Sequence, residues 1–329
     1  MTGQEEEIIS GIAEVNGTKL YYELKGEGQA LILIHGGALD RRIWDDQFEV
    51  FAEHYKVIRY DVRGHGKSRP PPKPYSDYED LYHLLRFLNI EKAHLMGLSL
   101  GGRIVIDFAL EHPEMVETLI PVAPGLSGYI FSAEHLQGMM KIVYSIQEDD
   151  GSPARELWLQ SPYNAPAMEN PAVAQQLWPI AIENSHVWLI NPLFPRPLFP
   201  PALQRLSEIR APTLVIVGDR DLADIQKIVE TLEVGIPGIK KVVIPGAGHL
   251  VSMEKPEQFN KIVLDFLSQG TASDEETARK EWLPFDSKDL HLLRNPLKLK
   301  GRPEEASREN YQQWGTAKRP WQSPRRDTT

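Results

Sequence analysis

The segment Gly97-Leu98-Ser99-Leu100-Gly101-Gly102 places a serine between glycines two positions before and two positions after it. The apolar run 93–97 precedes the serine, and the apolar residues of 100–112 have helical spacing. In a strand-turn-helix context, G-x-S-x-G presents a nucleophilic serine, because the strained turn lifts Oγ clear of the sheet. The free N–H groups at the start of the helix favour an oxyanion. A glycine-rich turn without chemistry is the alternative, and the flanking strand and helix favour catalysis by Ser99.

A serine hydroxyl is a weak nucleophile, so a neighbouring base must take its proton. Of the ten histidines, His249 is the best placed. It ends the glycine-rich loop 245–249, directly after the apolar run 241–244, and a loop at the carboxyl end of a strand can bring an imidazole to Ser99. The other histidines fall on predicted helices, strands or turns, or in the segments 125–210 and 270–329, where plainer roles explain them.

The base in turn needs a carboxylate that holds its tautomer. Asp221 is the predicted acid, because Gly218-Asp219-Arg220-Asp221 follows the apolar run 214–217 and the chain needs a few residues to turn back toward the histidine loop. Asp219 is an alternative whose plainer role is to stabilise the turn. Asp224 is a second alternative, and its position predicts the N-cap of the next helix.

A tetrahedral oxyanion requires two backbone donors. Leu100, directly after the serine, supplies one of them. The second is expected from His35-Gly36-Gly37-Ala38, the loop that follows the apolar run 31–34. Gly37 is the first choice and Ala38 the second, because glycine lets a backbone N–H approach an oxygen closely. The side chain of His35 is predicted to brace this loop and not to act on a substrate.

Strands alternate with helices around these motifs. Short apolar runs predict buried strands at 31–34, 57–60, 93–97, 214–218 and 241–244. Helical spacing predicts helices at 44–54, 78–88, 100–112, 225–232 and 256–267. The alternation predicts an α/β fold, a mostly parallel sheet with helices on both faces. Segments 10–15 and 18–25 flank Asn16-Gly17 and predict a hairpin at the antiparallel edge of that sheet.

The alternation breaks between residues 125 and 210. This stretch contains predicted helices at 133–146 and 171–187 and a proline cluster at 192–201 that excludes a helix interior. A long insertion of this kind usually forms a lid. Its large apolar residues are expected either to line an acyl site or to form the lid's own core: Met139, Met140, Trp158, Trp178, Trp188 and Phe194.

These boundaries predict three parts. Residues 1–124 and 211–269 form the core, and residues 125–210 form the helical lid. Residues 270–329 are charged and poor in aliphatic side chains, which predicts a disordered or loosely docked tail.

Composition narrows the classes of function. Hydrophobic residues make up 41% and charged residues 25% of the chain, the ordinary balance of a globular protein. The absence of cysteine excludes disulfides, thiol catalysis and cysteine-bound zinc. A net charge of −10 opposes general binding to nucleic acid. No apolar run reaches a membrane-spanning length and the N-terminus is acidic, so we expect no membrane span, no secretory signal and a cytoplasmic location.

Together these motifs resemble those of the α/β-hydrolase family, in particular its esterase and enol-lactonase group. The resemblance covers roughly residues 10–268 and rests on His35-Gly36-Gly37, Asp61-Val62-Arg63-Gly64-His65-Gly66-Lys67-Ser68, Gly97 to Gly102, Gly218 to Asp221, and Gly248-His249 followed by Glu254, Pro256 and Phe259. The order Ser, Asp, His is that of the family. The family's counterpart of 61–68 is structural. The family often has a proline shortly after the acid, and Asp221-Leu222-Ala223-Asp224 has none.

The resemblance implies the α/β-hydrolase fold and hydrolysis of a small or medium uncharged carboxylic ester through an acyl-enzyme. Ser99 would attack the carbonyl with His249 as base and Asp221 as its partner, while the N–H groups of Gly37 and Leu100 hold the oxyanion. No metal or organic cofactor is implied. Branches of the family that use aspartate as nucleophile, the haloalkane dehalogenases and epoxide hydrolases, are disfavoured by the serine.

Two alternatives stay open at this stage. Within the same fold, the enzyme is an enol-lactonase or a hydrolase of C–C bonds beside a ketone, although C–C hydrolases usually have a longer glycine-rich loop than Gly36-Gly37. From another class, the chain is a non-catalytic receptor or scaffold of the same fold. Degenerate members of that kind usually lack one of the three triad residues, and all three candidates are present here.

Overall fold

The computed structural model describes residues 7–70, 73–145, 152–189 and 195–271. The chain divides into two units, Met1–Ser273 and Asp274–Thr329, and every described residue belongs to the first. Apart from residues 270 and 271, the predicted tail 270–329 lies outside the described residues.

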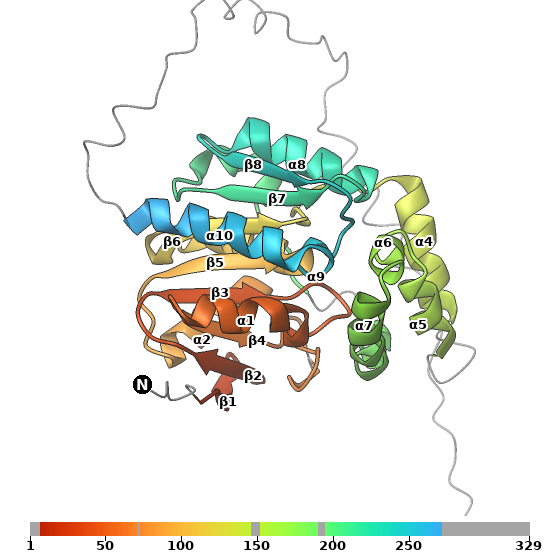
Figure 1. The fold of residues 1–329 in the computed structure, drawn as a ribbon, viewed down its shortest axis with the longest axis horizontal. Coiled ribbons are helices and arrows are strands. Elements are labelled where there is room, and N and C mark those ends of the chain that lie inside the picture. Colours follow the sequence, from red (N-terminus) through yellow and green to blue (C-terminus); the bar gives the residue numbers. More distant parts are fainter. Residues whose placement is uncertain (1–6, 71–72, 146–151, 190–194, 272–329) are drawn as a thin grey trace, which may run out of the picture. The chain divides into compact units, whose positions relative to one another are not determined.

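An eight-stranded sheet forms the centre of the first unit, in the order β1-β2-β4-β3-β5-β6-β7-β8 (Figure 1). Its strands are β1 (Ile9–Val15), β2 (Thr18–Lys25), β3 (Ala30–Ile34), β4 (Lys56–Tyr60), β5 (Ala93–Leu98), β6 (Val116–Val122), β7 (Leu214–Gly218) and β8 (Lys240–Ile244). The predicted hairpin β1–β2 is antiparallel and lies at one edge, and β2 pairs antiparallel with β4. The remaining pairs are parallel. Strands β3, β5 and β7 are buried along their whole length, which explains their unbroken apolar sequences.

Strand β6 is the one strand that the sequence patterns did not predict. Glu117 and Pro121 interrupt its apolar run, and proline disfavours a central strand because it has no N–H to donate. The structure accommodates Pro121 because pairing with β7 is sparse there. Val122 pairs with Ile216, and an isolated bridge joins Leu119 to Thr213.

The helices are α1 (Asp45–Ala52), α2 (Asp77–Phe87), α3 (Leu100–Glu111), α4 (Ala133–Ser145), α5 (Ser152–Leu159), α6 (Ala165–Met168), α7 (Pro171–Glu183), α8 (Ala223–Gly235), α9 (Val251–Glu254) and α10 (Pro256–Thr271). Short 3₁₀ helices are η1 (Arg41–Trp44), η2 (Pro113–Met115), η4 (Ser185–Leu189), η5 (Ala202–Gln204) and η6 (Leu206–Glu208). Helices α1 and α10 pack together in front of the sheet in Figure 1, and α2 lies behind it. Helix α3 packs against α2 and against β5 and β6. The sheet is therefore covered on both faces, as the alternating pattern predicted.

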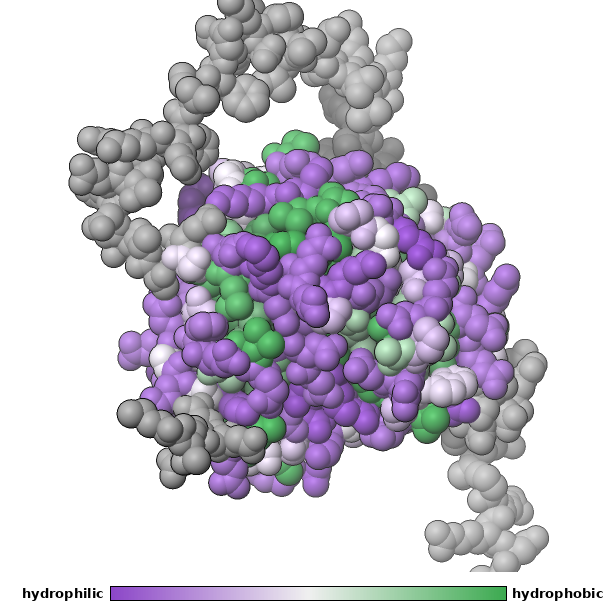
Figure 2. Space-filling view, viewed as in Figure 1, coloured by the Kyte–Doolittle hydropathy of each residue, from purple (hydrophilic) through white to green (hydrophobic). Residues whose placement is uncertain are grey.

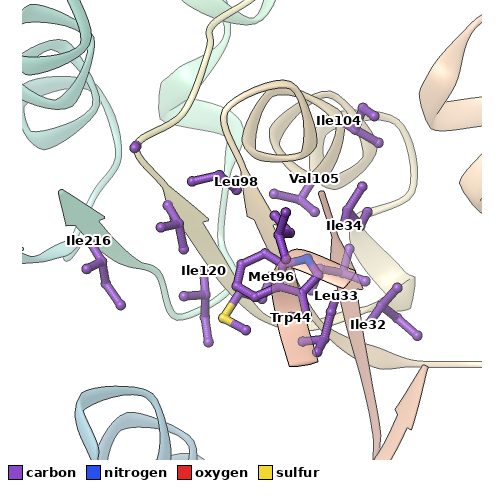
Figure 3. Close-up of a cluster of buried hydrophobic side chains, with 14 of the residues drawn as sticks. Ile32, Leu33, Ile34, Trp44, Met96, Leu98, Ile104, Val105, Ile120 and Ile216 are labelled. Atoms are coloured by element: carbon purple, nitrogen blue, oxygen red, sulfur yellow. The ribbon is translucent and has the colours of Figure 1, made fainter. Parts of the chain in front are cut away.

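A dense apolar cluster supports the end of the sheet where the candidate nucleophile lies (Figure 3). Ile34 and Leu98 end strands β3 and β5, and they gather there with Ile104 and Val105 of α3. All four side chains are at most 1% exposed. Full burial of a large aliphatic side chain stabilises a fold by about 1.5–3 kcal/mol, so this cluster holds the two strand ends rigidly.

The insertion contributes α4 to α7 and η4, and these helices gather at one end of the sheet (Figure 1). Its first anchor is Asp224, whose carboxylate accepts hydrogen bonds from the backbone N–H and hydroxyl of Ser132 and from the hydroxyl of Tyr129. The prediction that Asp224 caps α8 is therefore wrong, and Leu222 occupies the N-cap position. The carboxylate holds the start of α4 instead, since Ser132 Oγ accepts from His135 N at 3.2 Å.

A second anchor fixes the other end of the insertion. Asn184, which is fully buried, donates from Nδ2 to Asp40 at 2.8 Å and accepts at Oδ1 from the backbone N–H of Gly66 at 2.7 Å. His186 lies 2.9 Å from the carbonyl of Gly64. The insertion is thus tied to the first turn of α8 and to the loops after β3 and β4.

The surface in the view of Figure 2 is mostly hydrophilic, with smaller apolar patches between the charged side chains. Within the described ranges, no helix combines the length and the hydropathy needed to cross a bilayer.

Candidate active site

Ser99 has an unusual backbone conformation between β5 and α3. Its φ is 53° and its ψ is −106°, a region that residues with a side chain rarely adopt. Hydrogen bonds fix this conformation: Ser99 N donates to Val122 O at 2.9 Å, and Ser99 O accepts from Arg103 N at 3.0 Å and from Gly125 N at 2.9 Å. The side chain lies at the edge of a cavity, as expected for a strained turn that presents Oγ.

The glycines around Ser99 are required by backbone packing. A Cβ on Gly97 would lie 2.2 Å from the carbonyl oxygen of Gly101, and a Cβ on Gly101 would lie 2.2 Å from that of Ile34. These distances are far inside van der Waals contact, and backbone atoms cannot swing aside. The same close approach allows Gly101 N to donate to His35 O at 3.1 Å, which ties the turn to the neighbouring loop.

The loop after β3 runs directly beside Ser99. A Cβ on Gly36 would lie 3.5 Å from the Ser99 Cβ, and Ala38 has a positive φ of 56°. His35 braces the loop, as predicted: its Nε2 accepts from Val62 N at 2.9 Å, so its Nδ1 carries the proton and donates to Gly36 O at 2.7 Å. Burial lowers the pKa of His35 to about 4, which keeps this ring neutral.

The backbone N–H groups of Gly37, Ala38 and Leu100 have no acceptor among the residues the structure describes. Gly37 is exposed and Ala38 is buried, and all three residues line the cavity that contains Ser99. Free N–H groups on both sides of a serine are the donors that an oxyanion site needs. Gly37 therefore stays the first choice for the second donor, with Ala38 as the alternative.

Asp221 and His249 form a buried pair. Both carboxylate oxygens of Asp221 lie 3.0 Å from His249 Nδ1, and the two side chains are 0% and 5% exposed. Asp221 Oδ1 also accepts from Leu222 N at 2.7 Å, which fixes the carboxylate. Since Nδ1 is committed to this contact, Nε2 is the ring nitrogen left for a proton transfer. No proline after the acid is needed for this geometry.

The loop that carries His249 is held from two sides. Glu254 accepts from Gly248 N at 2.9 Å and from Leu250 N at 3.1 Å, so its carboxylate brackets the histidine. Burial raises the pKa of Glu254. Asp219 accepts from Gly246 N at 2.7 Å, so its carboxylate joins the turn after β7 to the histidine loop.

Ser99 and His249 line one cavity of about 520 Å³. The printed side-chain contacts of His249 go to Asp221, and no hydrogen bond joins the described side chains of Ser99 and His249 directly. On the insertion side the wall is mostly aromatic and aliphatic, with Phe131, Met139, Val143, Trp158 and Trp188. The volume and the apolar lining suit a small organic molecule.

Near the candidate triad the cavity wall has further polar residues, to which the sequence patterns gave no role at the site. Arg103, one helical turn after Ser99, pairs with Asp77 at the start of α2. Tyr163 stacks edge-on against His249, with ring centres 4.6 Å apart. His65, His135 and Asn164 also line the cavity. Their positions depend on how α2 and the insertion fold onto the core, which no local motif encodes.

Three of the six apolar lid candidates, Met139, Trp158 and Trp188, line the cavity. Met140 and Trp178 do not, and they are 37% and 43% exposed, so neither alternative predicted for them is correct. Phe194 lies outside the described residues. In the part of the chain that the structure covers, no cluster of three or more His, Asp or Glu side chains is arranged to hold a metal ion.

Comparison with models of known protein families identifies the family of this chain. Residues 31–262 match the model of the alpha/beta hydrolase family. The chain belongs to the α/β-hydrolase family. This match contains the loop at 35–38, the turn around Ser99, and both Asp221 and His249.

Curated relatives of this α/β-hydrolase include a carboxylesterase and several hydrolases of 2-hydroxy-6-oxo dienoates. The carboxylesterase YbfK of Bacillus subtilis is 27% identical over 257 residues, which cover 74% of this chain and 82% of that protein. A 2-hydroxy-6-oxononadienedioate/2-hydroxy-6-oxononatrienedioate hydrolase of Burkholderia vietnamiensis is 30% identical over 270 residues, covering 77% and 92%. Among solved structures, the enol-lactonase of Burkholderia xenovorans superposes with a TM-score of 0.66 at 27% identity, covering 78% of this chain and all of that one.

Proposed function

We propose that this α/β-hydrolase is a serine esterase that hydrolyses carboxylic esters through a Ser99–His249–Asp221 triad. The observation that carries the proposal is the buried Asp221–His249 pair, with 3.0 Å contacts, opening on the same cavity as the strained Ser99. A buried carboxylate bonded to imidazole Nδ1 fixes the tautomer that can accept a proton at Nε2. A non-catalytic receptor or scaffold protein does not require a histidine whose tautomer is fixed beside a serine.

The reaction then proceeds in two halves. His249 Nε2 takes the proton of Ser99 Oγ as the oxygen attacks the ester carbonyl, and Asp221 stabilises the imidazolium. The N–H groups of Leu100 and Gly37 hold the oxyanion. Collapse of the intermediate breaks the ester C–O bond, and His249 protonates the leaving alcohol. Water, deprotonated by His249, attacks the acyl-enzyme, and the acid leaves with Ser99 restored.

The insertion acts as a lid that covers the acyl pocket. Its aromatic and aliphatic wall supports an uncharged acyl group, and a cavity of about 520 Å³ supports a short or medium chain. The predicted division into a core, 1–124 and 211–269, and a lid, 125–210, is part of this proposal. No metal or organic cofactor takes part in the proposed steps, and the proposed setting is the cytoplasm.

C–C bond hydrolysis is the second candidate, because hydrolases of 2-hydroxy-6-oxo dienoates stand among the relatives at 28–30% identity. Lactone hydrolysis is supported in the same way by the enol-lactonase structure. All three reactions begin with a carbonyl in the same oxyanion site, so the substrate distinguishes them and the triad does not.

A panel of p-nitrophenyl esters from acetate to dodecanoate tests the proposal, together with an enol-lactone and a 2-hydroxy-6-oxo dienoate. We expect hydrolysis of the esters with an optimum at short or medium chain length. Ser99→Ala should lower kcat by about 10⁴ or more, while Ser207→Ala, which removes an exposed serine, should match the wild type. Hydrolysis of only the dienoate or the lactone would replace the esterase assignment, and full activity of Ser99→Ala would end it.

A further inference from the structure

The insertion places an aromatic ring directly against the candidate base. Tyr163, shortly before α6, packs edge-to-face on His249, with ring centres 4.6 Å apart and ring planes at 64°. Aromatic rings favour this arrangement. Asp221 contacts the imidazole at Nδ1, and a ring held at one nitrogen can still tilt. A second group packed against the ring restricts that tilt.

Helix α4 braces Tyr163 in turn. The ring centre of His135, in the first turn of α4, lies 5.5 Å from that of Tyr163, and both of its ring nitrogens lie 3.4 Å from the Tyr163 hydroxyl oxygen. The His135 ring stacks on Phe131, with centres 4.2 Å apart. The tyrosine is therefore held between the insertion's own aromatic residues and the imidazole of His249.

Two further contacts hold the same segment of the insertion on the loops of the candidate triad. A Cβ on Gly248 of the histidine loop would lie 2.7 Å from Cβ and Cγ of Pro166, so the first turn of α6 packs on the backbone of that loop. Glu169, at the end of α6, accepts from Arg220 at 2.7 and 2.8 Å, in the turn after β7. This ion pair is exposed and contributes little energy, but it lies beside Asp221.

We infer that Tyr163 is a positioning residue for the reaction: its ring holds the imidazole of His249 in the orientation from which Nε2 reaches Ser99 Oγ. The inference rests on the proposed esterase function and gives the insertion a part in the chemical step besides covering the pocket. A misplacement of about 1 Å in a reacting group can lower a rate by about a hundredfold. An imidazole that is free to tilt spends less time within reach of the serine.

Substitutions of Tyr163 test this on p-nitrophenyl acetate and p-nitrophenyl butanoate. Tyr163→Leu removes the ring and keeps an apolar side chain in the cavity wall. We expect kcat to fall by about fivefold to fiftyfold on both esters while KM changes by less than about twofold, because alignment is lost in the chemical step. Tyr163→Phe keeps the ring and should restore most of the rate. Tyr144→Leu, the same change at a position of α4 that is 59% exposed, is the matched control and should equal the wild type.

A double-mutant cycle separates positioning from a plain role in the cavity wall. If Tyr163 acts through the imidazole, adding Tyr163→Leu to His249→Gln should lower the residual rate on p-nitrophenyl acetate by less than about twofold, since no base is left to align. If the ring only shapes the cavity, the same substitution should lower the rate equally in both backgrounds. Should Tyr163→Leu fail to fold, Tyr163→Met takes its place in every comparison.

The outcomes separate the inference from the esterase proposal. A loss confined to kcat, restored by Tyr163→Phe and absent in the His249→Gln background, supports the positioning role. Full kcat in Tyr163→Leu, a rise in KM alone, or an equal loss in both backgrounds overturns it and leaves the esterase standing. A wild-type rate in His249→Gln itself counts against the triad, whatever Tyr163 does.

Discussion

At the scale of single residues, Ser99 is held at φ 53° by hydrogen bonds from β6 and α3. Glycine adopts positive φ at little cost, whereas a side chain there costs about 1–3 kcal/mol. Alanine retains the Cβ and therefore the strain, whereas glycine relieves the strain but loses more entropy on folding. The strain is the larger of the two effects, so we expect Ser99→Gly to be more stable than Ser99→Ala by about 1 kcal/mol. Thermal unfolding of both inactive variants measures this. Equal melting temperatures would mean that the turn is unstrained.

A second residue-scale prediction concerns Asp107 on α3. Burial raises the pKa of its carboxyl to about 6, and its Oδ2 accepts from Ser127 Oγ at 2.6 Å. The unfolded pKa is about 3.9, so the folded protein binds more protons between these values and loses stability as pH rises from about 4 to about 6. The loss is at most about 3 kcal/mol.

The side chain of the Asp107→Asn variant cannot ionise. The Tm of this variant minus the Tm of the wild type should therefore rise by several degrees between pH 4.5 and pH 7.5. Asp265→Asn, on the exposed side of α10, serves as the control and should show no such pH-dependent gain. A pH-independent difference for Asp107→Asn would show that Asp107 is ionised throughout.

The residues of the candidate triad could be proposed from sequence because each follows a recognisable strand end. The glycines around Ser99 and His249 mark turns that only small residues fit. Arg103 and Asn164 gave no such mark. Their place in the cavity wall comes from tertiary packing, which chain-local patterns do not contain.

At the scale of elements, the turn between β5 and α3 depends on backbone contact with β3. Gly101→Ala would place its Cβ 2.2 Å from the Ile34 carbonyl, so we expect loss of folded protein or destabilisation beyond about 3 kcal/mol. Gly138→Ala, in α4 with open space around it, should instead be neutral or stabilising by about 0.5–1 kcal/mol. Soluble yield and Tm measure both, and a stable Gly101→Ala would contradict the packing argument.

Elements with a clean hydrophobic period were predictable, and those with a broken one were not. The strands buried on both faces, β3, β5 and β7, have unbroken apolar runs, so their positions were correct within a residue or two. Strand β6 was missed because Glu117 and Pro121 break its run. Helices α5 and α6 were missed because short helices in an insertion owe their form to tertiary contacts.

At the scale of the whole molecule, the first unit contains every element of the candidate site. It ends at Ser273, shortly after α10. We therefore expect a chain that ends at Ser273 to keep the Tm and the kcat/KM of the full protein on p-nitrophenyl butanoate. Loss of soluble protein or of activity on truncation would show that residues 274–329 support the core.

Covalent labelling tests directly whether Ser99 is a nucleophile that His249 and Asp221 activate. Incubation with diethyl p-nitrophenyl phosphate, followed by peptide mass spectrometry, identifies the side chain that displaces nitrophenolate. We expect one diethylphosphoryl group on Ser99 in the wild type, much slower labelling in His249→Gln, and none in Ser99→Ala. Labelling at another residue, or equal labelling of Ser99→Ala, would contradict it.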